Sequence, residues 1–456
     1  MSGTVPQRVS TRKKGDECMH KRFTKRFFTF VITLAMAGAM AACGSASTES
    51  TSGGSTSSSA SSQSRSGSSS GEGSVTTDKV TAASGSTTST EGTVVTNAAV
   101  SSGGAIDTTD LFTDRDLTQT ADLSEAKTCT VSDGQEIEIT EAGVYVITGS
   151  ASNATITVNV ADDEKVQLVL DGVNITNDSK PAIFVKNADK VFVTTASGTE
   201  NDLSVTGTFT KIDDTNTDAV IFSKDDLVVN GLGTLNISST DNGISCKDDL
   251  KITGGTINLA VSDAALEAND SIAIADGTIT VSSSNDALHA ENDDDNSKGY
   301  IYICGGTLEL TSADDGLHAT TVVQIDGGSM NITAGEGVEG TLIQINGGSV
   351  NIAASDDGIN AASKSSAYSP KVEVNGGEIT IVMGQGDTDG VDSNGDIIIN
   401  GGTVSVTGQS TFDYDGTGTI NGGTVISNGE EVTTLPNQVM GGGMGGGMGG
   451  GRGGWH

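Results

Sequence analysis

The sequence is poor in proline, aromatic residues and basic residues. Its 456 residues include only 4 prolines and 1 tryptophan, and aromatic residues make up 4%. Lys and Arg number 24 against 59 Asp and Glu, which gives a formal net charge of −35. Because so negative a surface repels phosphate, nucleic acid is excluded as the expected partner. The shortage of large rings means that any core must be built from aliphatic side chains.

Cysteine is scarce as well. Beyond Cys18 and Cys43, the chain has only Cys129, Cys246 and Cys304, which lie far apart in the sequence. An odd number of distant cysteines predicts no disulfide framework. Cys246 aligns with alanines of the repeats described below, so we expect it to be a small buried residue.

Glycine, by contrast, is abundant. There are 62 glycines, about twice the usual share, and they follow no G-X-Y period, so a collagen-like chain is excluded. Gly followed by Thr, Ser or Glu recurs from Gly233 to Gly423 at a spacing near 22 residues. Each unit contains two runs of alternating apolar and polar residues around a corner, which indicates strands. Units this short must stack to bury a face, so the prediction is an all-β, right-handed parallel β-helix with roughly 22-residue coils.

The amino end has the pattern of an export signal. Residues 19–43 comprise a basic region, an apolar run and small residues before Cys43. The apolar run is too short for a membrane-spanning helix, and the order is typical of a secretory signal. The sequence around Cys43 resembles a bacterial lipobox. This predicts lipidation at Cys43 and a place on the outer face of the cell membrane. Ordinary cleavage and secretion is the alternative, and Met19 could be the true start.

Composition divides the rest of the chain. We expect a disordered Ser/Thr/Gly-rich linker over 44–105, because it has too few apolar side chains to offset the entropy of ordering. An N-terminal cap with the first coils should span 106–200, the regular coils 201–435, and a disordered Gly/Met-rich tail 436–456. Residues 106–438 hold 13 basic and 53 acidic residues, a net charge of 13 − 53 = −40.

Stacking assigns a role to each column of equivalent residues, because neighbouring strands lie about 4.8 Å apart. One aliphatic column is predicted to be core; its members are Ile244, Leu266, Leu288, Leu317, Val338, Ile359 and Val391. Another column, before the glycines of each turn, is predicted to form a structural ladder; its members are Asp326, Asn346, Asn375, Asn400 and Asn421.

Three segments upstream of the regular coils resemble a known family. They are residues 139–149, 166–176 and 185–191. They are similar to the clostridial-type carbohydrate-binding β-helix domain, whose relatives bind cellulose and pectic polygalacturonate and carry calcium. The resemblance covers most of residues 130–430, and it implies a pectate-lyase-like shape, a polysaccharide partner and calcium. Relatives often carry Lys after the corner, whereas this chain has residues such as Glu267, His289 and His318, so ligand choice need not transfer.

An acidic column at the corner is the candidate metal site. Calcium, with oxygen ligands at about 2.3–2.6 Å, fits between carboxylates on rungs about 4.8 Å apart. The residues predicted to bind it are Asp286, Asp314, Asp315, Glu336, Asp356, Asp357, Asp387 and Asp389. The alignment continues the column to Asp415. The alternative is that these acids only solubilise the coil. His289 and His318, adjacent in one column, could instead hold a transition metal, or could be an exposed pair without a function.

Two coils are longer by seven residues, at 291–299 and 362–369, three coils apart. Both insertions should therefore project from one side, about 14 Å from each other. Tyr300, Tyr302 and Tyr368 lie at or beside them, and we predict that they form a platform on which sugars stack. The alternative is that the loops are tolerated insertions with incidental tyrosines.

The pattern favours binding over catalysis. A uronate lyase needs a Lys or Arg base beside its calcium. Lys247 and Lys298 are the nearest bases, and no motif singles out either one. A repeated ladder also differs from the single asymmetric constellation that catalysis requires. We therefore predict a monomeric, non-catalytic cell-surface protein that binds pectic polygalacturonate or cellulose and touches the membrane only through its lipid. A calcium-dependent lyase or hydrolase and a structural adhesin are the alternatives.

Overall fold

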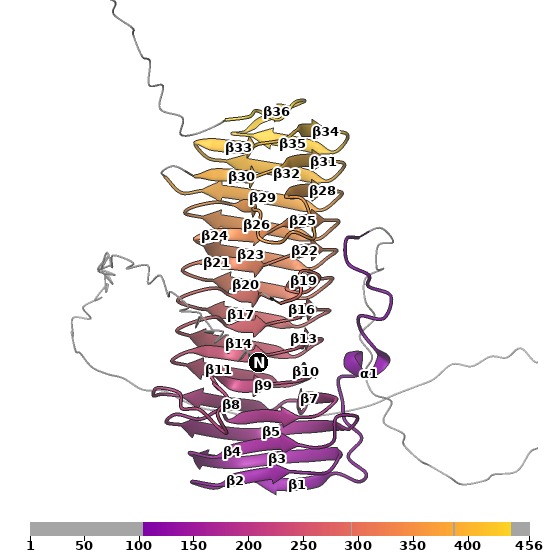
Figure 1. Cartoon of the computed structure of the whole chain (residues 1–456). Helices are drawn as coiled ribbons and strands as arrows, with labels where there is room; N and C mark the ends of the chain where they lie inside the picture. Colours follow the sequence, from indigo (N-terminus) through magenta and orange to yellow (C-terminus); the bar gives the residue numbers. More distant parts are fainter. Residues whose placement is uncertain (1–103, 293, 386–387, 439–456) are drawn as a thin grey trace, which may run out of the picture. The chain divides into compact units, whose positions relative to one another are not determined.

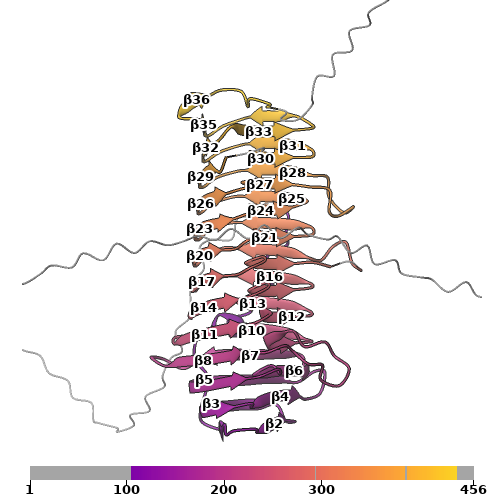
Figure 2. The ribbon, with the colours of Figure 1, turned by 90° about the vertical axis from the view of Figure 1, so that its left-hand side faces the viewer.

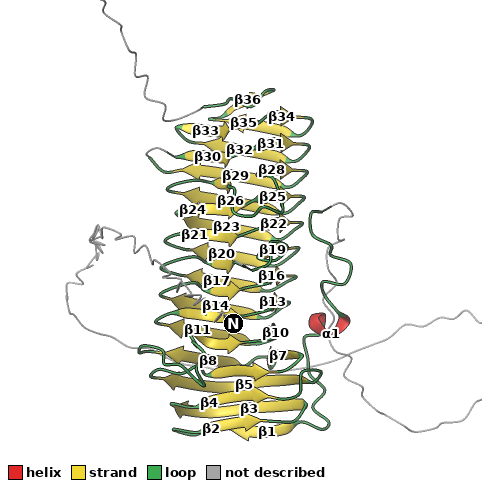
Figure 3. Ribbon diagram, viewed as in Figure 1, coloured by secondary structure: helices red, strands yellow, loops and turns green. Residues whose placement is uncertain are grey.

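The computed structural model describes residues 104–292, 294–385 and 388–438. Predictions for Cys43, Asp387, most of the linker and most of the tail lie outside these residues. In each regular coil of the described part, three short strands follow one another and pair in parallel with their equivalents in the next coil. Figures 1 and 3 show the resulting stack of strands. The predicted parallel β-helix is confirmed.

The strands form three faces, which we call faces A, B and C. Face A consists of β1 (Lys127–Thr130), β3 (Gly143–Ser152), β5 (Lys165–Asn177), β7 (Lys190–Thr195), β10 (Asp226–Gly231), β13 (Asp249–Ile252), β16 (Ser271–Ile274), β19 (Tyr300–Ile303), β22 (Val322–Ile325), β25 (Leu342–Ile345), β28 (Lys371–Val374), β31 (Asp396–Ile399) and β34 (Gly418–Ile420).

Face B begins with the second halves of β3 and β5, and these long strands join faces A and B into one sheet. It continues with β8 (Glu200–Val205), β11 (Thr234–Ser239), β14 (Thr256–Val261), β17 (Thr278–Ser282), β20 (Thr307–Thr311), β23 (Ser329–Ala334), β26 (Ser349–Ala354), β29 (Glu378–Met383), β32 (Thr403–Thr407) and β35 (Thr424–Ser427). A final strand, β36 (Glu430–Val432), pairs with β35 in the antiparallel sense.

Face C is a separate parallel sheet. It consists of β2 (Glu136–Ile139), β4 (Thr155–Asn159), β6 (Ile183–Asn187), β9 (Ala219–Ser223), β12 (Asn242–Cys246), β15 (Leu266–Ala268), β18 (Leu288–Ala290), β21 (Asp315–Ala319), β24 (Glu336–Gly340), β27 (Ile359–Ala361), β30 (Asp389–Ser393) and β33 (Ser410–Tyr414). Figure 2 shows this face beside the others.

The aliphatic column predicted from the repeat is the part of the core that face C contributes. Ile244 pairs with Leu266, Leu266 with Leu288, and the same register continues to Val391. Every member is at most 2% exposed. Cys246 is also fully buried and pairs with Ala268, which confirms its predicted packing role.

The predicted turn ladder is confirmed as a chain of side-chain hydrogen bonds. The amide of Asn346 donates to Asp326 over 2.6 Å, and Asn375 donates to Asn346 over 2.8 Å. Asn400 and Asn421 continue the chain, each donating to the preceding amide over 2.8 Å. Each turn is thereby tied to the turn below it.

Residues 104–119, which we call the N-terminal strap, lie against the outside of face A. The strap includes the only helix in the described part of the chain, α1 (Asp114–Leu117), a single turn that the sequence did not indicate. The Gln119 amide of the strap donates to the carbonyl of Thr253, directly after β13. The backbone N–H of Ala105 donates to the Gln344 side chain on β25. Figure 1 shows α1 beside the stack. Among the described residues there is no helix with the length and apolar character that crossing a bilayer requires.

Candidate functional site

A column of acids follows the edge of face C. Asp315 pairs with Glu336, and the registers of the neighbouring core residues place the other members at the same position of their coils. We call this set the corner acids; it comprises Asp286, Asp315, Glu336, Asp357 and Asp389. The backbone N–H of Asp315 donates to the Asp286 carboxylate over 2.9 Å, and that of Asp389 donates to Asp357 over 3.0 Å. The predicted column is therefore confirmed for these five residues.

The column ends earlier than the sequence indicated. Asp389 pairs with Ser410, so Asp415 is not its next member, and that part of the alignment is wrong. Asp314 and Asp356 precede the corner acids and are exposed. Asp387 lies outside the described residues.

A second column faces outward from the strands of face C. It includes two histidines, His289 and His318, and each lies beside the acid three residues earlier. We call this set the outer column; it comprises Glu267, His289, His318, Glu339, Asn360 and Asp392. The register of face C stacks these residues one above another. Together the two columns form a continuous polar band over successive coils.

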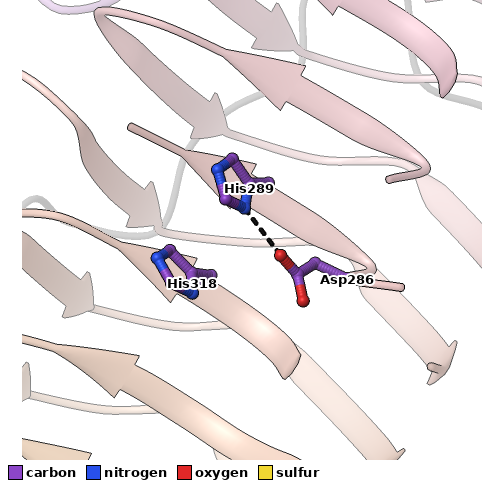
Figure 4. Close-up of side chains that lie close together, drawn as sticks. All are labelled: Asp286, His289 and His318. Carbon is purple, nitrogen blue, oxygen red and sulfur yellow. Dashed lines mark hydrogen bonds and ion pairs between the residues drawn. The ribbon is translucent and has the colours of Figure 1, made fainter. Parts of the chain in front are cut away.

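The two histidines form the most tightly bonded part of this band. Their rings stack with centroids 4.6 Å apart and planes inclined by 17°. Nδ1 of His289 lies 2.6 Å from the Asp286 carboxylate, and Nδ1 of His318 lies 2.6 Å from that of Asp315. Figure 4 shows the two rings one above the other, with Asp286 at the edge of the His289 ring.

Further carboxylates surround the pair. Nε2 of His289 lies 3.1 Å from Glu291, and Nδ1 of His318 lies 3.1 Å from Glu339. Burial alone would lower the pKa of both imidazoles. Hydrogen bonds with Asp286 and Glu291 outweigh burial and raise the pKa of His289 to about 10. Asp315 and Glu339 likewise raise the pKa of His318 to about 9. Both rings are therefore cationic at neutral pH.

Toward the carboxyl end the band contains no histidine. Its side chains there are carboxylates and one amide. Burial, followed by repulsion from Glu339 and Asp315, raises the pKa of Glu336 to about 8, although the Asn360 amide donates to it over 3.0 Å. Burial and neighbouring carboxylates, Asp392 first, raise the pKa of Asp357 to about 7. This half of the band thus contains carboxyl groups whose charged forms are disfavoured by burial and by one another.

The two long insertions follow the face C strands β18 and β27 and project from the same side of the stack, as predicted (Figure 2). They touch, because the Asn296 amide donates to the Ser366 hydroxyl over 3.0 Å and the Ser365 hydroxyl donates to the Asn296 carbonyl. Beside the first insertion lies a polar cavity of about 520 Å³, whose lining includes Glu267, His289, Glu291 and Lys298. The cavity therefore opens beside the outer column.

The predicted tyrosine platform is not formed. Tyr302 is fully buried, with its ring 6.3 Å from that of Phe112 in the N-terminal strap, so it cannot stack on a sugar. Its hydroxyl lies 3.0 Å from Asp326. Tyr300 belongs to the same face A strand and packs, half-buried, against the same cluster. Tyr368, in the second insertion, is half-buried.

The lysines near the band are paired with acids. Lys247 lies 2.9 Å from Glu267, Lys298 lies 2.5 Å from Asp270, and Lys364 lies 2.7 Å from Glu339. None of these three lysines is arranged as a general base.

Sequence reasoning identified the histidines and corner acids but missed the partners of the histidines. The signal is a repeated spacing: Asp286 precedes His289 by three residues, as Asp315 precedes His318. In an extended strand, residues three apart point to opposite faces. Here the two side chains of each pair nevertheless lie together, with Nδ1 of the histidine 2.6 Å from the acid.

Comparison with known proteins identifies the family of this chain. Residues 133–388, more than half of the sequence, match the model of the carbohydrate-binding domain-containing proteins. The chain belongs to this family. A carbohydrate-binding domain-containing protein of Acetivibrio thermocellus is 38% identical over 124 residues, which are 26% of this chain and 43% of the relative. The match thus spans less than half the length of that relative.

A solved structure, described as a polysaccharide lyase-like protein from C. thermocellum in a gadolinium derivative, is also similar. It is 29% identical to this chain, covers 48% of this chain and 96% of its own length, and has a TM-score of 0.44.

Proposed function

We propose that face C binds polysaccharide without cleaving it, and that the ligand is pectic polygalacturonate or cellulose. The observation that carries the proposal is the continuous polar band of a chain in the carbohydrate-binding family. The corner acids and the outer column repeat over consecutive coils at the strand spacing of about 4.8 Å. A periodic surface of this kind can contact several sugar rings of a linear polymer in the same way, which suits binding of an extended chain.

The pairing of the lysines supports binding rather than a lyase reaction. A lyase needs an unprotonated base beside the carbon that loses its proton. Lys247, Lys298 and Lys364 each lie within 3 Å of a carboxylate oxygen. Repetition along the stack also contrasts with the single asymmetric arrangement that a catalytic centre requires.

We further propose that calcium binds the oxygen-rich half of the band. Glu336, Asp357 and Asp389 stand on consecutive coils, with Asp392 in the adjacent column. Carboxylate oxygens are the donors that calcium prefers. Burial, followed by repulsion from neighbouring carboxylates, raises the pKa of Glu336 to about 8 and that of Asp357 to about 7, and a divalent cation would stabilise the charged forms that both effects disfavour. Bound there, calcium would neutralise the band and could also ligate a uronate carboxylate.

We also propose that the protein is anchored at the outer face of the cell membrane, because its amino end has the pattern of a lipoprotein signal. A lipid on Cys43 and a linker over 44–105 would hold the β-helix at a distance from the outer face of the membrane. The Cys43→Ala variant, expressed in the native cell, should move the protein from the membrane fraction to the medium.

Retention of the full-length protein on polysaccharides tests the proposed function. We expect retardation in gels that contain polygalacturonate, or pull-down by insoluble cellulose, with calcium but not with EDTA. The variant Glu336→Gln/Asp357→Asn should lose most of this retention. A matched control on face B, Glu309→Gln/Glu378→Gln, removes the same charge from exposed positions and should bind normally.

Three results would contradict parts of the proposal. If the protein binds neither polygalacturonate nor cellulose, binding on face C is refuted and a structural role is favoured. Retention that is the same with EDTA as with calcium would contradict the proposed role of calcium in binding. Release of unsaturated or reducing ends from polygalacturonate would establish a lyase or a hydrolase instead.

A further inference from the structure

The amino-terminal half of the polar band offers different metal ligands from the half proposed to bind calcium, because it contains histidines. One possible ligand atom from each of Asp286, His289 and His318 lies within 4.8 Å of the others. A second group of the same size comprises Asp315, His318 and Glu339. The two groups share His318, so five side chains from three consecutive coils converge on one locality.

We propose that His289, His318 and Asp286 bind a divalent transition metal such as zinc. Imidazole nitrogen is a preferred ligand of zinc, copper and nickel, whereas calcium takes oxygen ligands. Two histidines with one carboxylate are a common set of protein ligands for a metal that keeps an open coordination position. The proposed ion is thus chemically distinct from the calcium proposed farther along the band.

The spacing of the ligands suits such an ion. Zinc binds nitrogen and oxygen at about 2.0–2.2 Å, and a tetrahedral angle then places two ligands of one ion about 3.3–3.6 Å apart. The ligand atoms of Asp286, His289 and His318 all lie within 4.8 Å of one another. Side-chain movements of about 1 Å would bring them to the tetrahedral spacing. Because the stacked rings stand on adjacent parallel strands, the backbone fixes their separation before any ion arrives.

The surrounding acids complete the site. Asp315 lies 2.6 Å from Nδ1 of His318, the position at which a carboxylate commonly orients a metal-binding imidazole. Glu291 and Glu339 add negative charge within 3.1 Å of the two rings. His289 also lines the polar cavity of about 520 Å³, so the open coordination position would face a space large enough for a small ligand.

Zinc titration of the chelator-treated full-length protein tests the site. Calorimetry should show saturable binding of one ion with release of protons, because each imidazole must lose its extra proton before it can bind the metal. Cobalt in place of zinc should give visible absorption bands of a site with nitrogen ligands. His289→Ala and His318→Ala should each weaken zinc binding at least tenfold, and Asp315→Asn should weaken it about 10–100-fold. Circular dichroism should show an unchanged β-helix, and His318→Gln provides a second, better-packed variant if the alanine variants fail to fold.

Two controls separate this site from other metal ligands. His456→Ala removes a histidine outside the described residues and should leave the titration unchanged. Glu336→Gln/Asp357→Asn, which removes the proposed calcium ligands, should also retain zinc binding, and excess calcium should not displace zinc. The proposal is overturned if zinc does not bind saturably, if binding persists at full strength in both His→Ala variants, or if calcium displaces the ion.

Discussion

His289 and His318 lie ring over ring on adjacent coils, and each imidazole is held by the carboxylate three residues before it, at 2.6 Å. Two cationic rings at this distance repel each other. The arrangement is tolerated because Asp286, Asp315 and Glu339 lie close enough to compensate their charge. The pair therefore depends on the acidic band around it, which explains why the histidines and corner acids occur together.

The N-terminal strap should contribute substantially to stability through Asp116. This carboxylate is fully buried and lies 3.5 Å from Lys190 and 3.8 Å from Lys251, both of which are also buried. Asp116→Ala would leave two buried ammonium groups without this partner, and loss of one member of a buried pair costs about 3–5 kcal/mol. We expect a lower thermal midpoint. The exposed neighbour Asp114 is the control, and an Asp114→Ala midpoint that fell equally would contradict a specific role for Asp116.

Stability should decrease with rising pH because of Asp248. Burial, followed by repulsion from Asp270, raises the pKa of Asp248 to about 6. A raised folded-state pKa gives stability that is complete below the unfolded value, about 4, and is lost as the pH rises through about 6. Asp248→Asn should therefore match the wild type at pH 4 and exceed it by about 1 kcal/mol at pH 7.5, after allowance for solvent screening.

Denaturant unfolding at the two pH values measures this difference. Asp171→Asn is the matched control, because it removes one carboxylate from an exposed position of β5. Its stability relative to the wild type should be the same at both pH values. An equal gain for Asp248→Asn at both pH values would disprove the assignment.

The turn ladder should contribute in measurable steps. Asn375 donates to Asn346 and accepts from Asn400, so Asn375→Ala breaks two hydrogen bonds. At about 1 kcal/mol each, the loss should be about 1–2 kcal/mol. Asn375→Asp keeps the acceptor but cannot donate, and its thermal midpoint should fall between those of the wild type and the alanine variant. Equal midpoints for all three proteins would show that the ladder adds nothing to stability.

Calcium should stabilise the wild-type protein by mass action. At about 100 times its Kd, a ligand that binds only the folded state adds about 2.7 kcal/mol. We expect calcium to raise the thermal midpoint of the wild type and of Glu309→Gln/Glu378→Gln, but not that of Glu336→Gln/Asp357→Asn. A calcium effect that was the same in all three proteins would place the ion elsewhere.

Periodicity explains which features the sequence could predict. The core column from Ile244 to Val391 and the ladder from Asp326 to Asn421 repeat with the coil, so their partners follow from alignment. The burial of Tyr302 could not be predicted in this way, because it depends on Phe112, about 190 residues earlier, in a strap with no repeat. The end of the acidic column was misplaced because the position equivalent to Asp389 in the next coil is Ser410, which is not an acid, and the alignment moved on to a nearby acid, Asp415.

The hydrogen-bonded ladder makes the length of this protein adjustable. Each asparagine of the ladder donates to the turn before it, so a duplicated coil placed between Asn346 and Asn375 would leave every amide with the same kinds of partner. No new type of contact would have to arise. Each coil added in this way would lengthen the polar band by one step of about 4.8 Å. The number of sugar rings that such a protein spans would then be set by its count of coils.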